Sequence, residues 1–545
     1  MSHCPRSADL ARLMRIAHYC EKKGLSTAEG LEQALTGEAE ARKRLVGRRQ
    51  FMTDIGKCVA AGALIPTGRV GGIFRSVSPS IGIVGAGLAG LSCADALRSK
   101  GITSTLYDAN SRTGGRCFSL RNFFPGQVAE RGGEFIDNLH KTMLGYVQRF
   151  NLVKEDVVKP PGEVFYYFDG QHFPESAVVD EYRAFVTAMH VDLRSLSGTV
   201  TADNHTSVDV RIDNVSLLEY LEGHNGAGLV AGPVIKNAII ETYEAEYGLA
   251  ADEQSCLNFL LFIHADKRSK FTPFGIFSDE RWHVVGGNDK IVQNLTNIFE
   301  AQIQLDMRLV RIRLTSSGRF ELTFQRGATT LTRLHDAVVL SIPFTVLREV
   351  ELDNSLDLPP EKKAAINLLG YGTNAKMMIG FTSRPWVAQG SNGASYSDLA
   401  HHQTTWETNP TSATASHAVL TDYSSGERGA RLNPARVQTE AFNFLTDLNL
   451  VYPGAFAAAT RTNGQFLAHL EHWPSNPLTK GSYTCYTRGQ FTTIAGNEGK
   501  PVGNLHFAGE HANSFYEFQG FMEGAALSGI QAALEILQDI KVGNL

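Results

Sequence analysis

The chain of 545 residues contains no run of 18 apolar residues, so its sequence predicts no membrane-spanning helix. Its seven cysteines are scattered, without a C-x-x-C pair or zinc-type spacing, so we expect buried free thiols and neither a disulfide framework nor a metal site. A net charge of -5 gives no reason to expect nucleic-acid binding. What is left is a globular chain long enough for several domains and for a core that encloses a large ligand.

Residues 1–79 are expected to be an N-terminal extension. Within them, the segment Gly47–Pro66 begins with the pair Arg48-Arg49 and continues into a mildly apolar run, which is similar to a twin-arginine export signal. Such a signal would carry the folded protein to the periplasm. Asp54 and Lys57 interrupt the apolar run, so the alternative is a basic helix and a glycine-rich linker on a cytoplasmic protein.

The stretch that follows has the pattern of a dinucleotide-binding unit. Residues 81–84 are apolar and predict a strand, and Gly85, Gly87 and Gly90 then form G-x-G-x-x-G before a helical segment. A second strand ends at Asp108, an acid placed to accept from ribose hydroxyls. The glycines permit a tight turn, close approach to a pyrophosphate, and close packing of helix on strand.

The next residues distinguish between the dinucleotides. "SRTGGRC" places Arg112, Gly115 and Arg116 just beyond the second strand. This R-x-G-G-R segment resembles that of the flavin-containing amine oxidases, the family of monoamine oxidases and L-amino-acid oxidases. The resemblance implies FAD as the cofactor, with these residues on its pyrophosphate.

The resemblance continues to the C-terminus. "VAERGGEFID" is similar to the segment beside the flavin, "MRLVRIRL" to the strand that meets the adenine, and "LHFAGEHANSFYEFQGFMEGA" to the last strand and helix. It implies cofactor contacts from Gly133, Glu134, Val310, Gly509, Glu510, Phe521 and Met522.

Four positions concern the reaction and the attachment of the flavin. Lys376 falls where the family has a lysine that binds a water beside the flavin and supports reaction with oxygen. Tyr483 and Phe521 fall at the two aromatic positions that flank the substrate amine. Ser482 stands where the monoamine oxidases with covalent flavin have cysteine, so the resemblance implies non-covalent FAD.

The substrate stays open at this stage. L-amino-acid oxidases of this fold usually offer an arginine for the substrate carboxylate where this chain has Phe135, so either Arg281 replaces that arginine or the substrate is an amine without a carboxylate. Four acids, Glu134, Glu163, Glu244 and Glu246, are candidates to pair with a cationic tail. We therefore expect a primary amine or a basic L-amino acid.

The fold class implied is α/β, with a Rossmann-like FAD-binding domain of the GR2 type and a discontinuous α+β substrate domain. The expected FAD-binding segments are 80–165, 282–365 and 480–545, and the expected substrate segments are 166–281 and 366–479. The expected activity is oxidative deamination that yields ammonia and hydrogen peroxide. The alternatives are a desaturase-like or protoporphyrinogen-oxidase-like flavoenzyme and a flavin-bearing binding protein. The oligomeric state stays open, a homodimer included.

Overall fold

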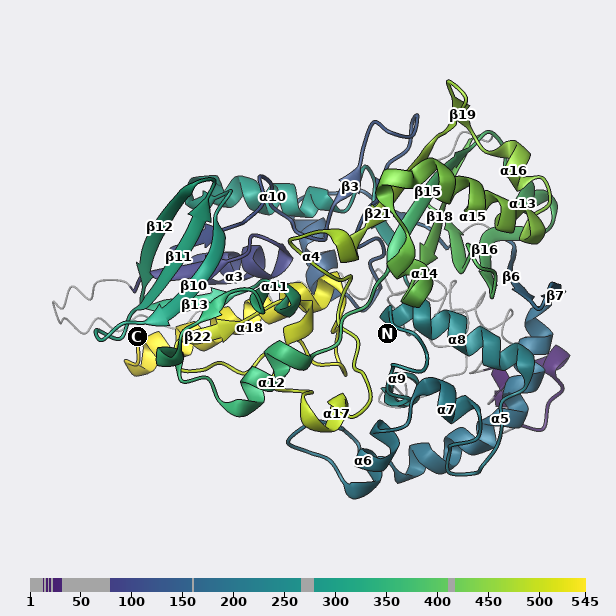
Figure 1. Ribbon diagram of the computed structural model, residues 1–545, viewed down its shortest axis with the longest axis horizontal. Helices are drawn as coiled ribbons and strands as arrows, with labels where there is room; N and C mark the ends of the chain where they lie inside the picture. Colours follow the sequence, from purple (N-terminus) through teal and green to yellow (C-terminus); the bar gives the residue numbers. More distant parts are fainter. Residues whose placement is uncertain are drawn as a thin grey trace, which may run out of the picture.

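The computed structural model describes residues 13, 16, 17, 19, 20, 23–31, 79–158, 161–265, 279–409 and 417–545. Figure 1 shows two bodies side by side, each built round its own sheet. The body on the left contains a five-stranded sheet and the long helix α18 (Met522–Val542), and the body on the right contains a seven-stranded sheet.

The five-stranded sheet is parallel throughout, with strand order β22-β13-β1-β2-β9. Its central strand is buried at every position, as expected of an apolar strand covered on both faces. The strand predicted over residues 81–84 is confirmed. The five strands are β22 (Leu505–Phe507), β13 (Ala337–Leu340), β1 (Ile81–Val84), β2 (Ser104–Tyr107) and β9 (Ile303–Gln304).

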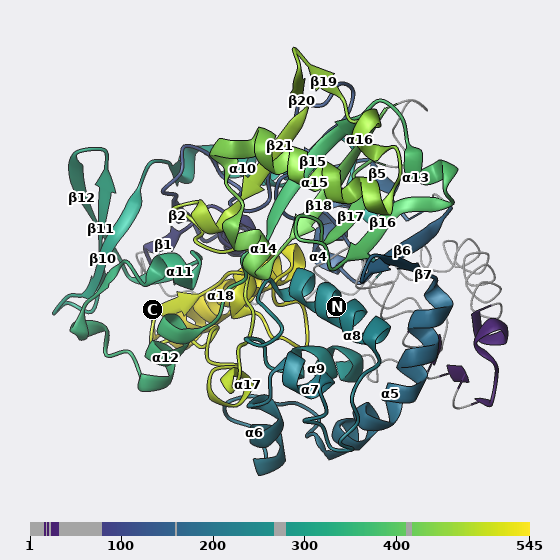
Figure 2. The same ribbon diagram turned by 45° about the vertical axis from the view of Figure 1, so that its right-hand side comes forward.

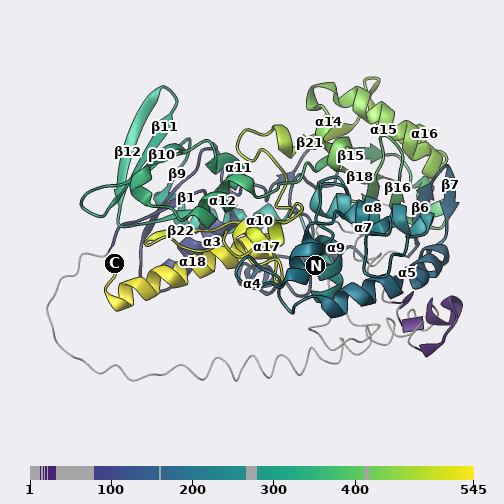
Figure 3. The ribbon, with the colours of Figure 1, turned by 60° about the horizontal axis from the view of Figure 1, so that its bottom comes forward.

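Helix α3 (Leu88–Arg98) follows β1 directly and lies beside α18 (Figure 3). The two helices approach closely because Gly529 lies against α3: a Cβ there would stand 2.0 Å from the carbonyl oxygen of Ala89. Helix α10 (Asp289–Phe299) also packs on α3. The packing of α18 on α3 thus holds the last helix of the chain beside the glycine-rich turn that follows β1.

A second, smaller sheet lies at the edge of the same body, with strand order β12-β11-β10-β14. Its first three strands form an antiparallel meander, and the strand predicted around Val310 is confirmed as β10. The four strands are β12 (Thr329–His335), β11 (Phe320–Arg326), β10 (Arg308–Leu314) and β14 (Glu351–Leu352).

The seven-stranded sheet has the order β21-β15-β18-β17-β16-β6-β7, and only the β6–β16 pair is parallel. It joins chain segments more than 200 residues apart, since β6 lies beside β16 (Figure 2). Strand β6 also crosses the boundary that we expected at residue 165. The strands are β21 (Ala468–His472), β15 (Ala375–Phe381), β18 (Ala418–Ser424), β17 (Thr404–Glu407), β16 (Ser391–Ser397), β6 (Glu163–Phe168) and β7 (Gln171–Phe173).

The helices that follow β7 in the chain, up to residue 265, lie on one side of this sheet (Figure 2) and share one apolar core. The sequence offers Asp213, Asn214 and Ser216 as helix caps, and Ser216 begins α7 through a reciprocal capping box with Glu219. Asp213 and Asn214 instead end the preceding helix. The helices are α5 (Glu175–Ser195), α6 (Ser207–Asp213), α7 (Leu217–Leu221), α8 (Pro233–Tyr247) and α9 (Leu257–Ala265).

The sequence "EVFYYFDGQHFP", with Asp169-Gly170 as the turn pair, predicts a hairpin, and the hairpin is present as β6 and β7. Its two turn residues, Asp169 and Gly170, have φ of +50° and +74°, as a type I′ turn requires.

The remaining α-helices and strands are β3 (Ser119–Leu120), β4 (Ala129–Glu130), α4 (Lys141–Arg149), β5 (Lys154–Asp156), β8 (Trp282–Val284), α11 (Phe344–Leu347), α12 (Pro360–Leu368), α13 (Pro385–Ala388), α14 (Gly426–Arg431), α15 (Val437–Val451), α16 (Ala455–Ala458), β19 (Arg461–Thr462), β20 (Gln465–Phe466) and α17 (Gln490–Thr493).

The described part of the N-terminal extension contacts the body that contains the seven-stranded sheet. Thr27 donates a hydrogen bond to Asp180 of α5, and Arg183 of α5 donates to Thr27 at 3.1 Å. The Arg48-Arg49 pair lies outside the described residues. Among those described, no helix combines the length and the apolarity needed to cross a membrane.

Candidate active site

One cavity runs from the glycine-rich turn after β1 to the seven-stranded sheet. It is lined from both ends of the chain, by Gly85 and Gly87 on one side and by Gly509, Glu510 and Phe521 on the other. Most of the predicted cofactor and substrate residues line it: Gly85, Gly87, Asp108, Arg112, Gly115, Arg116, Gly133, Glu134, Phe135, Lys376, Tyr483, Gly509, Glu510, Phe521 and Met522. Of the residues predicted to contact the cofactor, Gly90 and Val310 are outside its lining.

Gly90 and Val310 lie just behind the lining. A Cβ on Gly90 would stand 2.0 Å from the carbonyl oxygen of Gly85, so Gly90 serves the packing of α3 on the turn rather than a ligand contact. Val310 is half-buried on β10, whose residues Arg308 and Leu309 do line the cavity. The contact that the resemblance implies at Val310 is one of the backbone with the adenine, and it stays a prediction.

Asp108 is fixed at the end of β2 by the backbone. Its carboxylate accepts from the N–H of Ala86 at 2.7 Å and of Asn110 at 2.8 Å. Burial raises the pKa of Asp108, while these hydrogen bonds and Arg112 oppose that rise. Because a carboxylate has about four acceptor positions, it can still accept from ribose hydroxyls.

The basic residues of R-x-G-G-R take different partners. Arg112 donates to the carbonyls of Thr113 and Gly115, both at 2.9 Å, and its guanidinium lies 3.7 Å from the ring centre of Phe118. Arg116 donates to Glu510 at 3.0 Å and to the carbonyl of Ser482. The Arg116–Glu510 pair joins two motifs that are 394 residues apart in the chain.

The backbone of the glycine turns leaves room in which a flavin dinucleotide can bind. Gly85, Gly114 and Gly115 have φ of +106°, +97° and +56°, so their turns expose backbone rather than side chains. A Cβ on Gly87 would meet its first neighbour only at 4.0 Å. With the N-terminus of α3 beside this open backbone, the donors suit a pyrophosphate.

The far end of the cavity is formed by the N-terminus of α18. Phe521 is the residue before this helix, and Met522 begins it. A Cβ on Gly133 would stand 2.7 Å from the Met522 side chain, so this glycine lets the segment Gly132–Phe135 approach the helix. The positive end of the helix dipole favours negative charge on a group bound there.

Lys376 lies on β15, with its side chain 6% exposed. Its ammonium donates to Glu134 at 2.6 Å, to the Gly132 carbonyl at 2.8 Å and to the Glu130 carbonyl at 3.2 Å. Lys376 therefore reaches across from the seven-stranded sheet to the loop that lines the cofactor side. The ion pair explains how a strand otherwise made of apolar residues buries a charge.

Aromatic side chains surround this lysine. Its ammonium lies 5.6 Å from the ring centre of Trp406 and 5.8 Å from that of Tyr423. Tyr423 donates to the Tyr483 hydroxyl at 3.0 Å, and Phe135 meets Trp406 edge to face at 5.8 Å. Phe521 lines the same cavity and packs on His140, with ring centres 5.2 Å apart. We call Phe135, Trp406, Tyr423 and Tyr483 the aromatic wall.

Trp406 and Tyr423 were missed from the sequence. Both lie on strands of the seven-stranded sheet. The pairing of β15 with β18 sets Tyr423 opposite Lys376, and the pairing of β17 with β18 brings Trp406 close to them. The only available signal was an aromatic residue in an apolar strand, which is also the pattern of an ordinary core position.

Most of the acids, and the arginine, that were expected to bind substrate are outside the cavity lining. Glu163 is exposed on β6, Glu244 accepts from the N–H of Ala251 at 2.9 Å, and Glu246 is buried in α8 outside the cavity lining. Arg281 pairs with Asp156 at 2.6 Å and is also outside that lining. Of this group only Glu134 lines the cavity, where its partner is Lys376.

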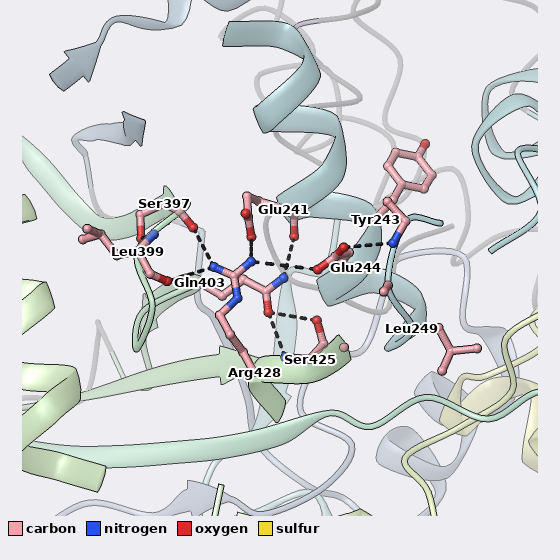
Figure 4. Close-up of polar contacts among 12 residues, drawn as sticks. Glu241, Tyr243, Glu244, Leu249, Ser397, Leu399, Gln403, Ser425 and Arg428 are labelled. Carbon is pink, nitrogen blue, oxygen red and sulfur yellow. Dashed lines mark hydrogen bonds and ion pairs between the residues drawn. The ribbon is translucent and has the colours of Figure 1, made fainter. Parts of the chain in front are cut away.

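A buried ion cluster joins α8 to α14 (Figure 4). Arg428 pairs with Glu241 and lies 3.9 Å from Glu244, and both acids are on α8. The next residue of that helix, Ala245, accepts a hydrogen bond from Tyr483 at 3.1 Å. The cluster thus positions a backbone acceptor for the aromatic wall.

We expect Arg428→Met to destabilise the protein by about 3–5 kcal/mol, because it leaves two buried carboxylates without their counter-charge. Chemical denaturation of the FAD-loaded protein measures this loss. Glu241→Gln combined with Arg428→Met is the matched control and should recover part of the stability. An unchanged free energy of unfolding in Arg428→Met would show that the cluster does not hold α8.

Asp422 lies beside this cluster, and its burial should make the stability of the protein depend on pH. It accepts from Ser424 at 2.7 Å and from the N–H of Gln403 at 3.2 Å, and burial raises its pKa from 3.8 to about 7. The folded protein then binds this proton more tightly than the unfolded chain, so stability should fall as pH rises from about 4 to about 7. Melting temperature against pH checks this, and Asp422→Asn should flatten the slope.

Comparison with known proteins agrees with this geometry. The flavin-containing amine oxidoreductase family matches residues 88–537. The chain therefore belongs to the flavin-containing amine oxidoreductase family. FAD is its cofactor, and it is a flavin oxidoreductase that acts on amines.

Two relatives and two solved structures show how far the likeness extends. L-amino-acid oxidases of Pseudechis australis and Siganus canaliculatus are 23% and 24% identical, and each alignment covers 85% of this chain and 88% or 86% of the relative. Cyclohexylamine oxidase from Brevibacterium oxydans IH-35A aligns with a TM-score of 0.70 at 20% identity, over 85% of this chain and 100% of that one. Putrescine oxidase bound to putrescine aligns with a TM-score of 0.68 at 17% identity, over 84% of this chain and 99% of that one. The predicted α/β fold with a Rossmann-like FAD domain is thereby confirmed.

Proposed function

We propose that the protein catalyses oxidation of a primary amine carried on an apolar group, with oxygen as the acceptor. The overall reaction converts amine, oxygen and water to a carbonyl compound, ammonia and hydrogen peroxide. The observation that carries the proposal is the position of Lys376, buried between the aromatic wall and the loop Gly132–Phe135 in a cavity that also contains the cofactor motifs.

FAD, when bound, accepts two electrons from the amine and transfers them to oxygen. The chain's own residues prepare the substrate. The aromatic wall and Phe521 exclude water and disfavour an ammonium, so the amine binds in its neutral form. Tyr483 is held by Tyr423 and Ala245, which fixes its ring for this purpose. Lys376 supplies a positive charge beside the Gly132 carbonyl, at the edge of the cofactor site.

The cavity favours an amine without an α-carboxylate. Near the aromatic wall, the basic side chains that line the described part of the cavity are Arg116 and Lys376, and each already pairs with a buried carboxylate. Phe135 adds no charge where an arginine would bind a carboxylate. A substrate carboxylate would therefore lose its hydration without gaining a free counter-charge.

Oxidation of an L-amino acid is the second candidate, and the two relatives named above favour it. Oxygen consumption by the purified protein with the twenty L-amino acids and with common amines separates the two. We expect the apolar amines to give the fastest consumption. If FAD is bound and no amine or amino acid consumes oxygen, the proposed function is wrong.

The cofactor is proposed to be non-covalent. Ser482 offers no thiol and donates to Asn374 at 2.6 Å, and Cys485 is buried outside the cavity lining. Acid precipitation should release all flavin into the supernatant. Yellow colour that stays with the pellet would contradict this.

A further inference from the structure

Four basic side chains line the described part of the cavity, and their partners decide the charge of its substrate end. Two of them are on the cofactor side, where Arg112 donates to backbone carbonyls and Arg308 pairs with Glu349 at the surface. The other two are Arg116 and Lys376. Lys376 is the one surrounded by the aromatic wall, so its charge matters most to a substrate.

Glu134 cancels that charge. Its side chain is 3% exposed, and one carboxylate oxygen accepts from Lys376 at 2.6 Å. The other oxygen accepts from the indole N–H of Trp406 at 3.0 Å. The carboxylate is thus fixed from two directions, and the ammonium and carboxylate together are neutral.

We propose that Glu134 determines the substrate class by neutralising Lys376, so that compounds with a carboxylate next to the reacting amine are excluded. This proposal rests on the proposed function, because it concerns which amines that reaction accepts. The resemblance had placed this acidic residue only at the cofactor, whereas the proposal makes it select substrates by their charge. We call this selection the charge filter.

The physical basis is the cost of an unpaired charge in a water-excluded site. The three N–H donors of the Lys376 ammonium are already taken by Glu134 and by the carbonyls of Gly132 and Glu130, so a second carboxylate could bind only by displacing one of them. Replacing Glu134 by glutamine keeps its size and one of its two acceptor oxygens but removes the negative charge. Lys376 would then be free to attract a carboxylate.

The test uses pairs of compounds that differ by one carboxylate, phenethylamine with L-phenylalanine and isopentylamine with L-leucine. The quantity measured is the ratio of kcat/KM for the amine to that for the amino acid. In the wild-type protein we expect a ratio of at least about 100, the size of effect seen when one charged group in a binding site is left unpaired. Glu134→Gln should lower the ratio about tenfold or more, mainly through a lower KM for the amino acid.

Glu407 provides a matched control. It is a buried glutamate with the same kind of partners, Arg384 at 2.7 Å and the indole N–H of Trp386 at 3.1 Å, but it lies outside the cavity lining. Glu407→Gln should cost stability and leave the ratio unchanged. Glu134→Asp keeps the charge and should retain most of the wild-type preference.

Benzoate gives a readout that does not depend on turnover. Titration of the flavin absorbance should show that Glu134→Gln binds benzoate about tenfold more tightly than the wild type does. Glu134→Asn, a shorter neutral side chain, is the second variant if Glu134→Gln does not retain FAD.

The outcomes are distinct. A wild-type ratio near 1, or a ratio and a benzoate affinity that stay unchanged in the neutral variants, would overturn the role of Glu134. If neither member of any pair consumes oxygen, the proposed function itself fails. The benzoate titration still reports on the charge filter in that case.

Discussion

Lys376→Met is expected to slow turnover with oxygen about 100-fold or more, while anaerobic reduction of the enzyme by amine stays within about threefold of the wild type. Removing one preorganised electrostatic group from a water-excluded site typically costs two to three orders of magnitude in rate. Methionine keeps the length and apolar stem of the lysine, so the packing on Trp406 and Tyr423 is largely retained. The loss would therefore fall on the step in which oxygen accepts electrons. Stopped-flow spectroscopy measures the two half-reactions separately.

The control for Lys376→Met addresses the acid that it leaves behind. Glu134 would remain buried without its ion-pair partner, which by itself destabilises a protein. The double variant Lys376→Met/Glu134→Gln removes both charges and should be more stable than Lys376→Met alone, yet equally slow with oxygen. Turnover with oxygen that survives in both variants would favour the desaturase-like or protoporphyrinogen-oxidase-like alternative.

The local parts of the fold could be predicted because short-range chemistry determines them. The apolar run before Gly85, the turn at Asp169-Gly170 and the cap at Ser216 each depend on neighbouring residues, and all three are present. Gly90 was also given the correct physical task, close packing, although it makes no contact with the cavity.

The long-range parts could not be predicted in the same way. The parallel pairing of β6 with β16 and the approach of Lys376 to Glu134 join segments more than 200 residues apart. No periodicity in the sequence specifies such partners. The four acids considered for a cationic tail show the consequence, since their partners were invisible until the sheet and α8 were in place.

The predicted roles at the site have a mixed basis. The glycines and Asp108 follow from the needs of a dinucleotide, whereas Lys376, Tyr483 and Phe521 came from the family resemblance. The structure brings both groups to one cavity. Trp406 and Tyr423 complete the aromatic wall and belong to neither group, because a buried aromatic residue in a strand has no distinguishing local signal.

Gly90→Ala is expected to yield protein that is purified without FAD. The added Cβ would stand 2.0 Å from the Gly85 carbonyl oxygen and 2.9 Å from the Ser341 hydroxyl, far inside van der Waals contact. Gly85 cannot move aside easily, because its φ of +106° and the hydrogen bond from Ser341 to its carbonyl fix the turn. Helix α3 would have to move away from β1, and its N-terminus with it. The absorbance of bound flavin per protein measures the loss, and we expect less than about a tenth of the wild-type value, since overpacking of this kind costs several kcal/mol.

Gly145→Ala is the matched control for Gly90→Ala. Gly145 lies within α4, and a Cβ there would meet nothing within 4 Å. Since alanine favours a helix over glycine by about 1 kcal/mol, this variant should bind FAD normally and melt at the same or a slightly higher temperature. If Gly90→Ala instead retains full flavin content, α3 does not need its close contact with the turn. The cofactor would then be held mainly by the C-terminal motif, through Gly509, Glu510 and the start of α18, with the first glycine-rich turn contributing little.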